Sequence, residues 1–164
     1  MADFHVDMSG RIYESKTIGI ALVCSERKIN FGCALKGNLV KLMKRKLFDK
    51  NIYEDSAKLY GICIYLLLKE ISEKVDVLII CNDEDFKIVK KTIKGLGNFD
   101  FEIIDIGEFR KRLGRNIGSL ADNYAKIYRR KALKPNRLSF GKKLNVVEVN
   151  YKIIEKSWGR LKDA

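Results

Sequence analysis

Residues 75–81 read VDVLIIC, and residues 82–85, which follow at once, read NDED. This boundary decides the fold. A nearly continuous apolar run of this length predicts a strand buried on both faces in the middle of a sheet. The acidic residues that follow it mark the carboxyl end of that strand, where the functional sites of α/β proteins are usually found. Asp83 is therefore a candidate site residue.

Helical patterns stand on both sides of this strand. Residues 54–74 carry apolar or small side chains at the i, i+3, i+4 and i+7 positions of one face, which predicts a core-facing helix. Residues 85–95 predict a second amphipathic helix, which Gly95 and Gly97 stop. Residues 99–106 then predict another strand, so strands and helices alternate through this half of the chain.

The N-terminal part has a different pattern. Ranges 3–7, 17–24 and 29–35 are rich in β-branched and aromatic residues and predict three strands of an antiparallel meander. The basic stretch 38–50 predicts a short amphipathic helix or an ordered insertion. We therefore expect an α/β protein whose mixed sheet has three antiparallel strands followed by β-α-β-α-β-α, with helices on both faces.

The C-terminal part is less regular. Ser119 is a fair N-cap for a helix over 120–133. Residues 1–135 are expected to form one domain, and residues 136–164 a C-terminal extension that packs on it. Within the extension the pattern indicates two elements, a strand over 144–149 and a helix over 151–162.

The net charge points to a class of partner. The chain holds 33 Lys and Arg against 21 Asp and Glu, which gives +12. An excess of one sign favours a polyanion, with nucleic acid ahead of an anionic membrane surface. A heavily charged surface alone explains the 33% charged residues but not the excess of cations. No apolar run is long enough to span a membrane and no signal peptide is evident, so a cytoplasmic protein is expected. The composition leaves the oligomeric state open.

The sulfur and imidazole groups do not indicate a zinc site, because the sequence has no C-x-x-C pair and a single histidine. His5 is two residues from Asp7 on the same predicted strand, and a core or hydrogen-bonding role is favoured over that of a base. Buried free thiols are expected for all four cysteines, which lie in apolar runs: Cys24, Cys33, Cys63 and Cys81.

Two carboxylates end predicted strands. Asp7 closes the first strand and Asp83 follows the buried one. If these strands are parallel neighbours, the two side chains meet at one edge of the sheet, where they repel unless a cation lies between them. Oxygen ligands of this kind suit Mg²⁺ or Mn²⁺. For either residue alone, a turn or helix cap is the simpler interpretation.

Two motifs carry a resemblance to a known family. Residues 116–125 read NIGSLADNYA, which contains the Ala-Asp-x-x-Ala core of a stretch found in the late helix of many ribonucleases H. Residues 54–57 read EDSA, which fits the Glu-x-x-Ala of the family's first long helix, and Gly61 supplies its further small residue. Over about residues 3–133, the chain resembles the ribonuclease H-like superfamily in its order of elements and in the places of four carboxylates.

The resemblance implies metal-dependent hydrolysis of phosphodiester bonds by two Mg²⁺ or Mn²⁺ ions. In that scheme Asp7 bridges both ions, Glu54 and Asp83 complete one, and Asp122 completes the other. The glutamate is expected on the same helix face as Ala57 and Gly61, where small residues let the helix approach the sheet. If this assignment is shifted along the chain, the reserve ligands are Glu84, Asp85 and Asp105.

Basic residues flank these carboxylates in the sequence, and between 110 and 134 the only acid is Asp122. Such a stretch is typical of phosphate contacts, although cations at a helix C-terminus also favour the helix dipole. The residues predicted to bind nucleic acid are Lys41, Lys44, Arg45, Lys46, Arg110, Lys111, Arg112, Arg115, Arg129, Arg130 and Lys131. Three aromatic residues are candidates either for stacking on unpaired bases or for the core: Tyr124, Tyr128 and Trp158.

Three functions stay open at this level. The first is a metal-dependent nuclease acting on DNA, RNA or hybrids, as an endonuclease or an exonuclease. The second is a ribonuclease H-like protein that binds nucleic acid without cutting it, with steep salt dependence. The third is an interaction or assembly protein with no nucleic-acid role, which predicts basic residues dispersed over the surface.

Overall fold

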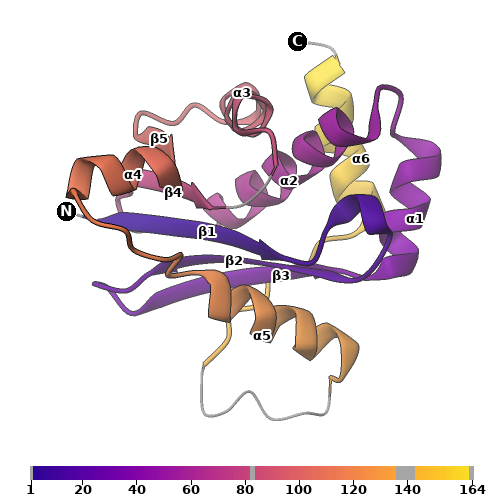
Figure 1. Cartoon of the computed structure of the whole chain (residues 1–164). Helices are drawn as coiled ribbons and strands as arrows, with labels where there is room; N and C mark the ends of the chain where they lie inside the picture. Colours follow the sequence, from indigo (N-terminus) through magenta and orange to yellow (C-terminus); the bar gives the residue numbers. More distant parts are fainter. Residues whose placement is uncertain (1, 82–83, 136–142, 163–164) are drawn as a thin grey trace.

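The computed structural model describes residues 2–81, 84–135 and 143–162 (Figure 1). Its sheet has the strand order β3-β2-β1-β4-β5. The strands β1, β2 and β3 are antiparallel neighbours, β4 runs parallel to β1, and β5 runs parallel to β4. The protein is therefore α/β with a mixed sheet of three antiparallel and two further parallel strands, as predicted. The strands are β1 (Asp3–Ser9), β2 (Ile18–Cys24), β3 (Ile29–Leu35), β4 (Val77–Cys81) and β5 (Glu102–Asp105).

Helices cover both faces of this sheet. In Figure 1, α5 lies under one face and α2 over the other. Helix α3 packs on α2, and α6 contacts both α2 and α3. A short 3-10 helix, η1 (Ile12–Glu14), joins β1 to β2. The helices are α1 (Gly37–Lys46), α2 (Ile52–Leu68), α3 (Phe86–Leu96), α4 (Ile106–Leu113), α5 (Asp122–Leu133) and α6 (Tyr151–Lys162).

The predicted helix over 54–74 is shorter at its C-terminus and starts two residues earlier. The Asn51 side chain caps α2 by accepting a hydrogen bond from the Glu54 amide at 2.8 Å, so Glu54 lies in the first turn as predicted. Helix α2 ends at Leu68 because residues 69–74 read KEISEK, which offers little apolar surface to bury. The prediction placed Gly61 toward the sheet, but a Cβ there would lie 2.8 Å from the Thr92 side chain of α3. The absence of a side chain at Gly61 therefore allows the close approach of α3 to α2, and not that of the sheet.

Close contact between α5 and the sheet depends on two glycines. A Cβ at Gly19 of β2 would lie 2.3 Å from the Ala125 carbonyl oxygen, and one at Gly32 of β3 would lie 2.3 Å from the Tyr128 ring. No side chain fits at such distances, so glycine lets the helix rest on the backbone of the strands. The predicted cap is wrong: Ala121 is the N-cap of α5, and the Ser119 hydroxyl instead accepts a hydrogen bond from the Ala121 amide at 3.2 Å.

Helix α4 was missed by the sequence prediction, which placed no element between the strand over 99–106 and the helix over 120–133. Its N-cap is Asp105, whose carboxylate accepts a hydrogen bond from the Glu108 amide at 2.8 Å. Gly114, at φ +66°, ends the helix in the left-handed conformation that glycine adopts without strain. Only Phe109 of this helix is buried, so its apolar periodicity is too weak to stand out among the cations.

The described part of the C-terminal extension packs into the hydrophobic core of the domain formed by the preceding residues. Trp158 of α6 is 1% exposed, stacks on Phe48 at 5.6 Å between ring centroids, and carries the Lys58 ammonium 4.0 Å from its ring centroid.

Residues 144–149 form no strand but a single bridge, between Val146 and Gly32 of β3. Tyr128 donates a hydrogen bond to the Asn30 side chain and is 3% exposed. Tyr128 and Trp158 are thus core residues and not platforms for bases.

Two further expectations concern chemistry and membranes. All four cysteines are free and buried, as predicted. In the described ranges, no helix combines the length and the apolar character that crossing a bilayer requires.

Candidate functional site

The register of the parallel ladder brings Asp7 to the end of β4. Asp7 pairs with Cys81, the last residue of that strand. The Asp7 carboxylate is largely buried, at 8% exposure, and accepts a hydrogen bond from the Met8 amide at 2.8 Å. Asp83 follows Cys81 by two residues in the sequence, and it lies outside the described residues. The expected neighbourhood of β1 and β4 is confirmed as parallel strands.

Asp7 belongs to the face of the sheet that α5 covers. Directly opposite it on β2 is Ala21, and residues directly opposite in an antiparallel pair project from the same face. Ala21 packs in one apolar cluster with Ala121 and Ala125 of the α5 region. His5, on the same face of β1, meets the Phe109 ring of α4 edge-on at 5.1 Å. Helices α4 and α5 therefore frame Asp7.

Cys81 lies among polar groups of this face. Burial raises the pKa of its thiol to about 12, with a smaller contribution from the Asp7 carboxylate. A hydrogen bond with Ser119 and the positive charge of Arg110 act in the opposite direction. The Arg110 guanidinium also donates to the Ile117 carbonyl at 2.8 Å, which fastens the segment before α5. With no metal bound, this raised pKa keeps the thiol protonated at neutral pH.

Tyr60 of α2 lies near the same strand ends. Its hydroxyl is buried and has no hydrogen-bond partner within the ranges that the structure describes. Burial raises the pKa of this phenol well above its ordinary value, and the charges of Asp7 and Glu84 raise it further. A buried hydroxyl without a hydrogen-bond partner is costly, so this phenol is, within the described part of the chain, an unsatisfied polar group near the ends of β1 and β4.

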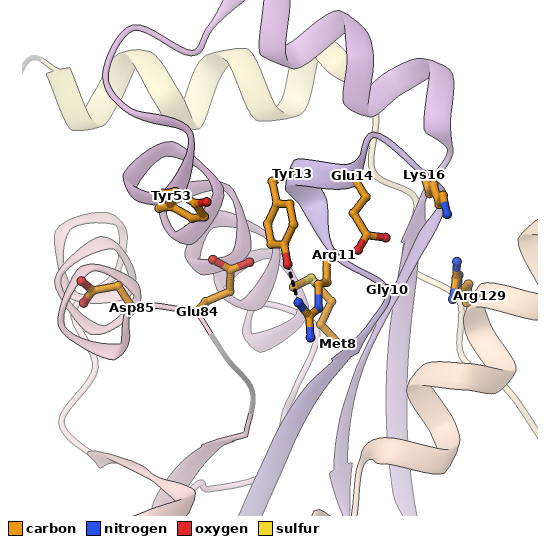
Figure 2. A pocket seen from close by; sticks show the side chains of 10 residues that line it. All are labelled: Met8, Gly10, Arg11, Tyr13, Glu14, Lys16, Tyr53, Glu84, Asp85 and Arg129. Carbon is orange, nitrogen blue, oxygen red and sulfur yellow. Dashed lines mark hydrogen bonds between the residues drawn. The ribbon is translucent and has the colours of Figure 1, made fainter.

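A hollow of about 780 Å³ opens beyond the carboxyl ends of β1 and β4 (Figure 2). Tyr53, at the start of α2, is one wall of it. Acidic residues that follow β4 lie on one side of the view, and Lys16 and Arg129 lie on the other. The lining residues are Met8, Gly10, Arg11, Tyr13, Glu14, Lys16, Tyr53, Glu84, Asp85 and Arg129.

Glu54 lines a different hollow, of about 500 Å³, together with Thr92 of α3 and Leu161 of α6. It is adjacent in sequence to Tyr53, but successive residues of a helix project about 100° apart. The tyrosine lines the hollow at the sheet edge, whereas the glutamate lines the one beside α3. The structure therefore does not place these two neighbours in one site.

The remaining predicted carboxylates have structural partners. Asp122 is the first residue of α5, and its carboxylate lies 3.0 Å from the Lys126 ammonium. Asp85 caps α3 by accepting hydrogen bonds from the Lys87 and Ile88 amides. Asp105 caps α4 in the same manner. The reserve ligands Asp85 and Asp105 are thus helix caps, and Asp85 also lines the 780 Å³ hollow.

Several predicted cations hold the protein itself together. The Lys44 ammonium donates to the Tyr13 carbonyl at 2.7 Å and to the Ser15 hydroxyl at 2.6 Å, and burial lowers the pKa of this amine. Arg112 forms a two-pronged ion pair with Glu102, at 2.6 and 2.7 Å. The more exposed members of the predicted set are Lys41, Arg45, Lys46, Lys111, Arg115 and Arg130, while Lys131 is half-buried.

The donors at this edge are of the type that hard divalent cations prefer, since they are carboxylates beside a protonated thiol. Within residues 2–81, 84–135 and 143–162, however, no three Asp, Glu, His or Cys side chains are placed to share an ion.

The residues of the hollow that the sequence prediction missed include Arg11, Tyr13, Glu14, Lys16 and Tyr53. Two signals were present. Tyr53 is an aromatic residue on the polar side of a helix start, and Arg11 follows Gly10, whose φ of +91° turns the chain at the end of β1. Neither is specific without the fold, because exposed tyrosines and basic turns are common.

Comparison with protein-family models, curated proteins and solved structures finds no match to this chain.

Proposed function

We propose that this protein is a ribonuclease H-like, metal-dependent nuclease that hydrolyses phosphodiester bonds of DNA or RNA. The observation that carries the proposal is the register between Asp7 and Cys81, which places the carboxyl end of β4 beside the strand that bears Asp7. The mixed sheet, with three antiparallel strands before the parallel ones, is the arrangement that the sequence resemblance implies.

In this proposal Asp7 and Asp83 hold Mg²⁺ or Mn²⁺, and Glu84 takes the part that the resemblance assigns to Glu54. Glu84 lines the hollow at the sheet edge, whereas Glu54 lines the hollow beside α3. Asp122 keeps the role that the resemblance implies, on the helix that covers the Asp7 face. When bound, the metal supplies a water of lowered pKa as nucleophile and stabilises the leaving oxygen.

The chain itself supplies position and charge. Asp7 and Cys81 are buried, so bulk water is kept away from these two residues. Charges act more strongly there than in solvent. Arg110 lies close enough for its charge to act on the Cys81 thiol, and a cation there attracts a phosphate that approaches Asp7.

A second candidate is a ribonuclease H-like protein that binds nucleic acid and does not cut it. Two observations favour it: Glu54 does not line the sheet-edge hollow, and Asp122 is paired with Lys126. The third possibility, an assembly protein without a nucleic-acid role, predicts that the purified protein binds no nucleic acid at low salt.

The decisive experiment incubates the folded protein with labelled single-stranded, double-stranded and hybrid substrates, with Mg²⁺, with Mn²⁺ or with chelator. Metal-dependent cleavage that Asp7→Asn abolishes supports the nuclease. Salt-sensitive binding without cleavage of any substrate supports the second candidate and rejects the first. Absence of both binding and cleavage leaves the assembly role.

A further inference from the structure

The sheet-edge hollow has an aromatic wall that phosphodiester hydrolysis does not require. Tyr53 is 67% exposed at the first turn of α2, and its ring meets that of Tyr13 edge-on, with centroids 5.9 Å apart and planes at 61°. A large aromatic side chain left so exposed contributes little to the core. Its open ring face is therefore available to a flat partner.

The aromatic wall consists of Tyr53 and Tyr13, and other residues hold Tyr13 in place. The Arg11 guanidinium donates a hydrogen bond to the Tyr13 hydroxyl and lies 5.8 Å from the centroid of that ring. The Tyr13 carbonyl accepts a hydrogen bond from Lys44 of α1 at 2.7 Å. Ser15, which ends η1 at φ +57°, accepts from the same ammonium. Tyr13 is thus ordered before any ligand arrives, and its ring supports that of Tyr53, which lowers the entropic cost of binding.

Charges of both signs line the hollow (Figure 2): Glu84 and Asp85 lie at one side of the view, Lys16 and Arg129 at the other, and Arg11 and Glu14 between them. Arg11, Lys16 and Arg129 come from the region of η1 and α5, where Glu14 is the acid that lines the hollow with them. Arg129 is anchored by donating its Nε hydrogen to the Thr17 carbonyl at 2.8 Å. On the opposite side, Glu84 and Asp85 follow β4. One side thus suits a phosphate and the other suits a cation.

We propose that this hollow is a subsite for one unpaired nucleotide, whose base stacks on Tyr53 and whose phosphate faces Arg11, Lys16 and Arg129. The volume of about 780 Å³ lies within the roughly 300–1,000 Å³ of small-ligand sites. A paired base exposes only its edge, so a duplex cannot make this stack without opening. The inference rests on the proposed nucleic-acid function and deepens it: the substrate class is a strand with an unpaired segment next to the site.

The test measures binding in chelator, so that no cleavage interferes. Fluorescence anisotropy with an end-labelled oligothymidylate and with a labelled duplex of equal length is compared for wild type, Tyr53→Ala and Tyr53→Phe. Tyr53→Ala is expected to weaken single-strand binding about tenfold, as the loss of one base–aromatic stack does, and to leave the duplex unchanged. Tyr53→Phe keeps the ring and is expected to bind as wild type does.

A second pair of variants tests the phosphate side. Lys16→Gln is expected to lower the slope of log affinity against log salt by about 0.7 for the single strand, because one phosphate contact is lost. Lys74→Gln is the matched control, since Lys74 is an exposed lysine that precedes β4 and so lies at the opposite end of that strand. It should leave the slope unchanged.

The outcomes separate the two proposals. If Tyr53→Ala binds the single strand as tightly as Tyr53→Phe does, the subsite is rejected, while metal-dependent cleavage by the wild type still supports the nuclease. If Tyr53→Ala has the expected effect but no substrate is cut with metal, the subsite holds and the nuclease fails. If neither single strand nor duplex binds at low salt, both proposals fail.

Discussion

Asp7 of β1 stands in register with Cys81 of β4 in the parallel part of the sheet. This pairing is the centre of the candidate site. It joins a strand near the N-terminus to one from the middle of the chain. Glu84 and Asp85, which follow β4, line the hollow beyond the carboxyl ends of these two strands. Helix α5 closes the same face, since Ala21, opposite Asp7, packs on Ala121 and Ala125.

Removing the charge of Asp7 is expected to abolish cleavage. Asp7→Asn keeps the shape of the side chain but loses a metal-binding carboxylate, and metal ions contribute several kcal/mol of transition-state stabilisation. We expect a loss of about a thousandfold or more in the rate constant of cleavage, with little change in single-strand binding. Asp100→Asn, an exposed aspartate outside the hollow, is the control. Cleavage by Asp7→Asn at the wild-type rate would show that the site lies elsewhere.

The two glutamates are expected to differ. Glu84 lines the sheet-edge hollow and Glu54 lines the hollow beside α3. Glu84→Gln should reduce cleavage about tenfold or more, an effect of the size seen when groups around a bound metal are altered. Glu54→Gln should stay within about twofold of wild type. The measurement is single-turnover cleavage over a range of Mn²⁺ concentrations. The reverse order of effects would restore Glu54 to the role that the resemblance implies.

Adding one methyl group under α5 is expected to destabilise the protein. In Gly19→Ala the new Cβ would lie 2.3 Å from the Ala125 carbonyl oxygen, a backbone atom that moves only with the helix. Overpacking of this kind costs about 1–3 kcal/mol in the free energy of unfolding. Gly159→Ala in α6 is the matched control, because nothing lies within 4 Å of its Cβ. It should be neutral or gain up to about 1 kcal/mol from its helix propensity. Equal urea midpoints for the two variants would contradict this packing.

His5 is expected to make stability depend on pH. Burial lowers the pKa of this imidazole below its ordinary value of 6.5, an effect that the more distant charge of Glu26 partly opposes. The unfolded chain therefore binds the proton more readily than the folded protein does. The contribution of neutral His5 to stability is present above about pH 6.5 and is lost as the pH falls. Urea midpoints between about pH 7 and pH 5 should fall more steeply for wild type than for His5→Gln. Parallel profiles would show that His5 protonates equally in both states.

Much of the fold was predictable because each strand shows its own pattern. The runs at 17–24, 29–35 and 75–81 are apolar and rich in β-branched residues, and all three form strands within a residue or two of the predicted ends. Helix α4 escaped prediction because a helix that buries one side chain, Phe109, leaves almost no periodicity in the sequence.

The candidate site was only partly predictable for a similar reason. The strand pattern correctly placed Asp7 on the first strand, but β1 continues to Ser9, so Asp7 does not end that strand as predicted. The separation of Glu54 from Tyr53 does not follow from the sequence pattern, because it depends on how α2 is rotated about its axis, and α3 and the sheet decide that rotation by packing on opposite sides of it. Likewise, Asp85 and Asp105 were candidate ligands by composition, and their hydrogen bonds to helix amides show that they are caps.

By itself, the sequence determined the α/β class, the order of the strands along the chain, the buried thiols and the cationic surplus, because these depend on local periodicity and on composition. The tertiary structure alone decided which residues lie side by side: Asp7 beside Cys81, and Tyr53 beside Tyr13. These contacts join residues distant in the chain. They depend on strand register and helix rotation, which the packing of the whole molecule sets and no short stretch of sequence encodes.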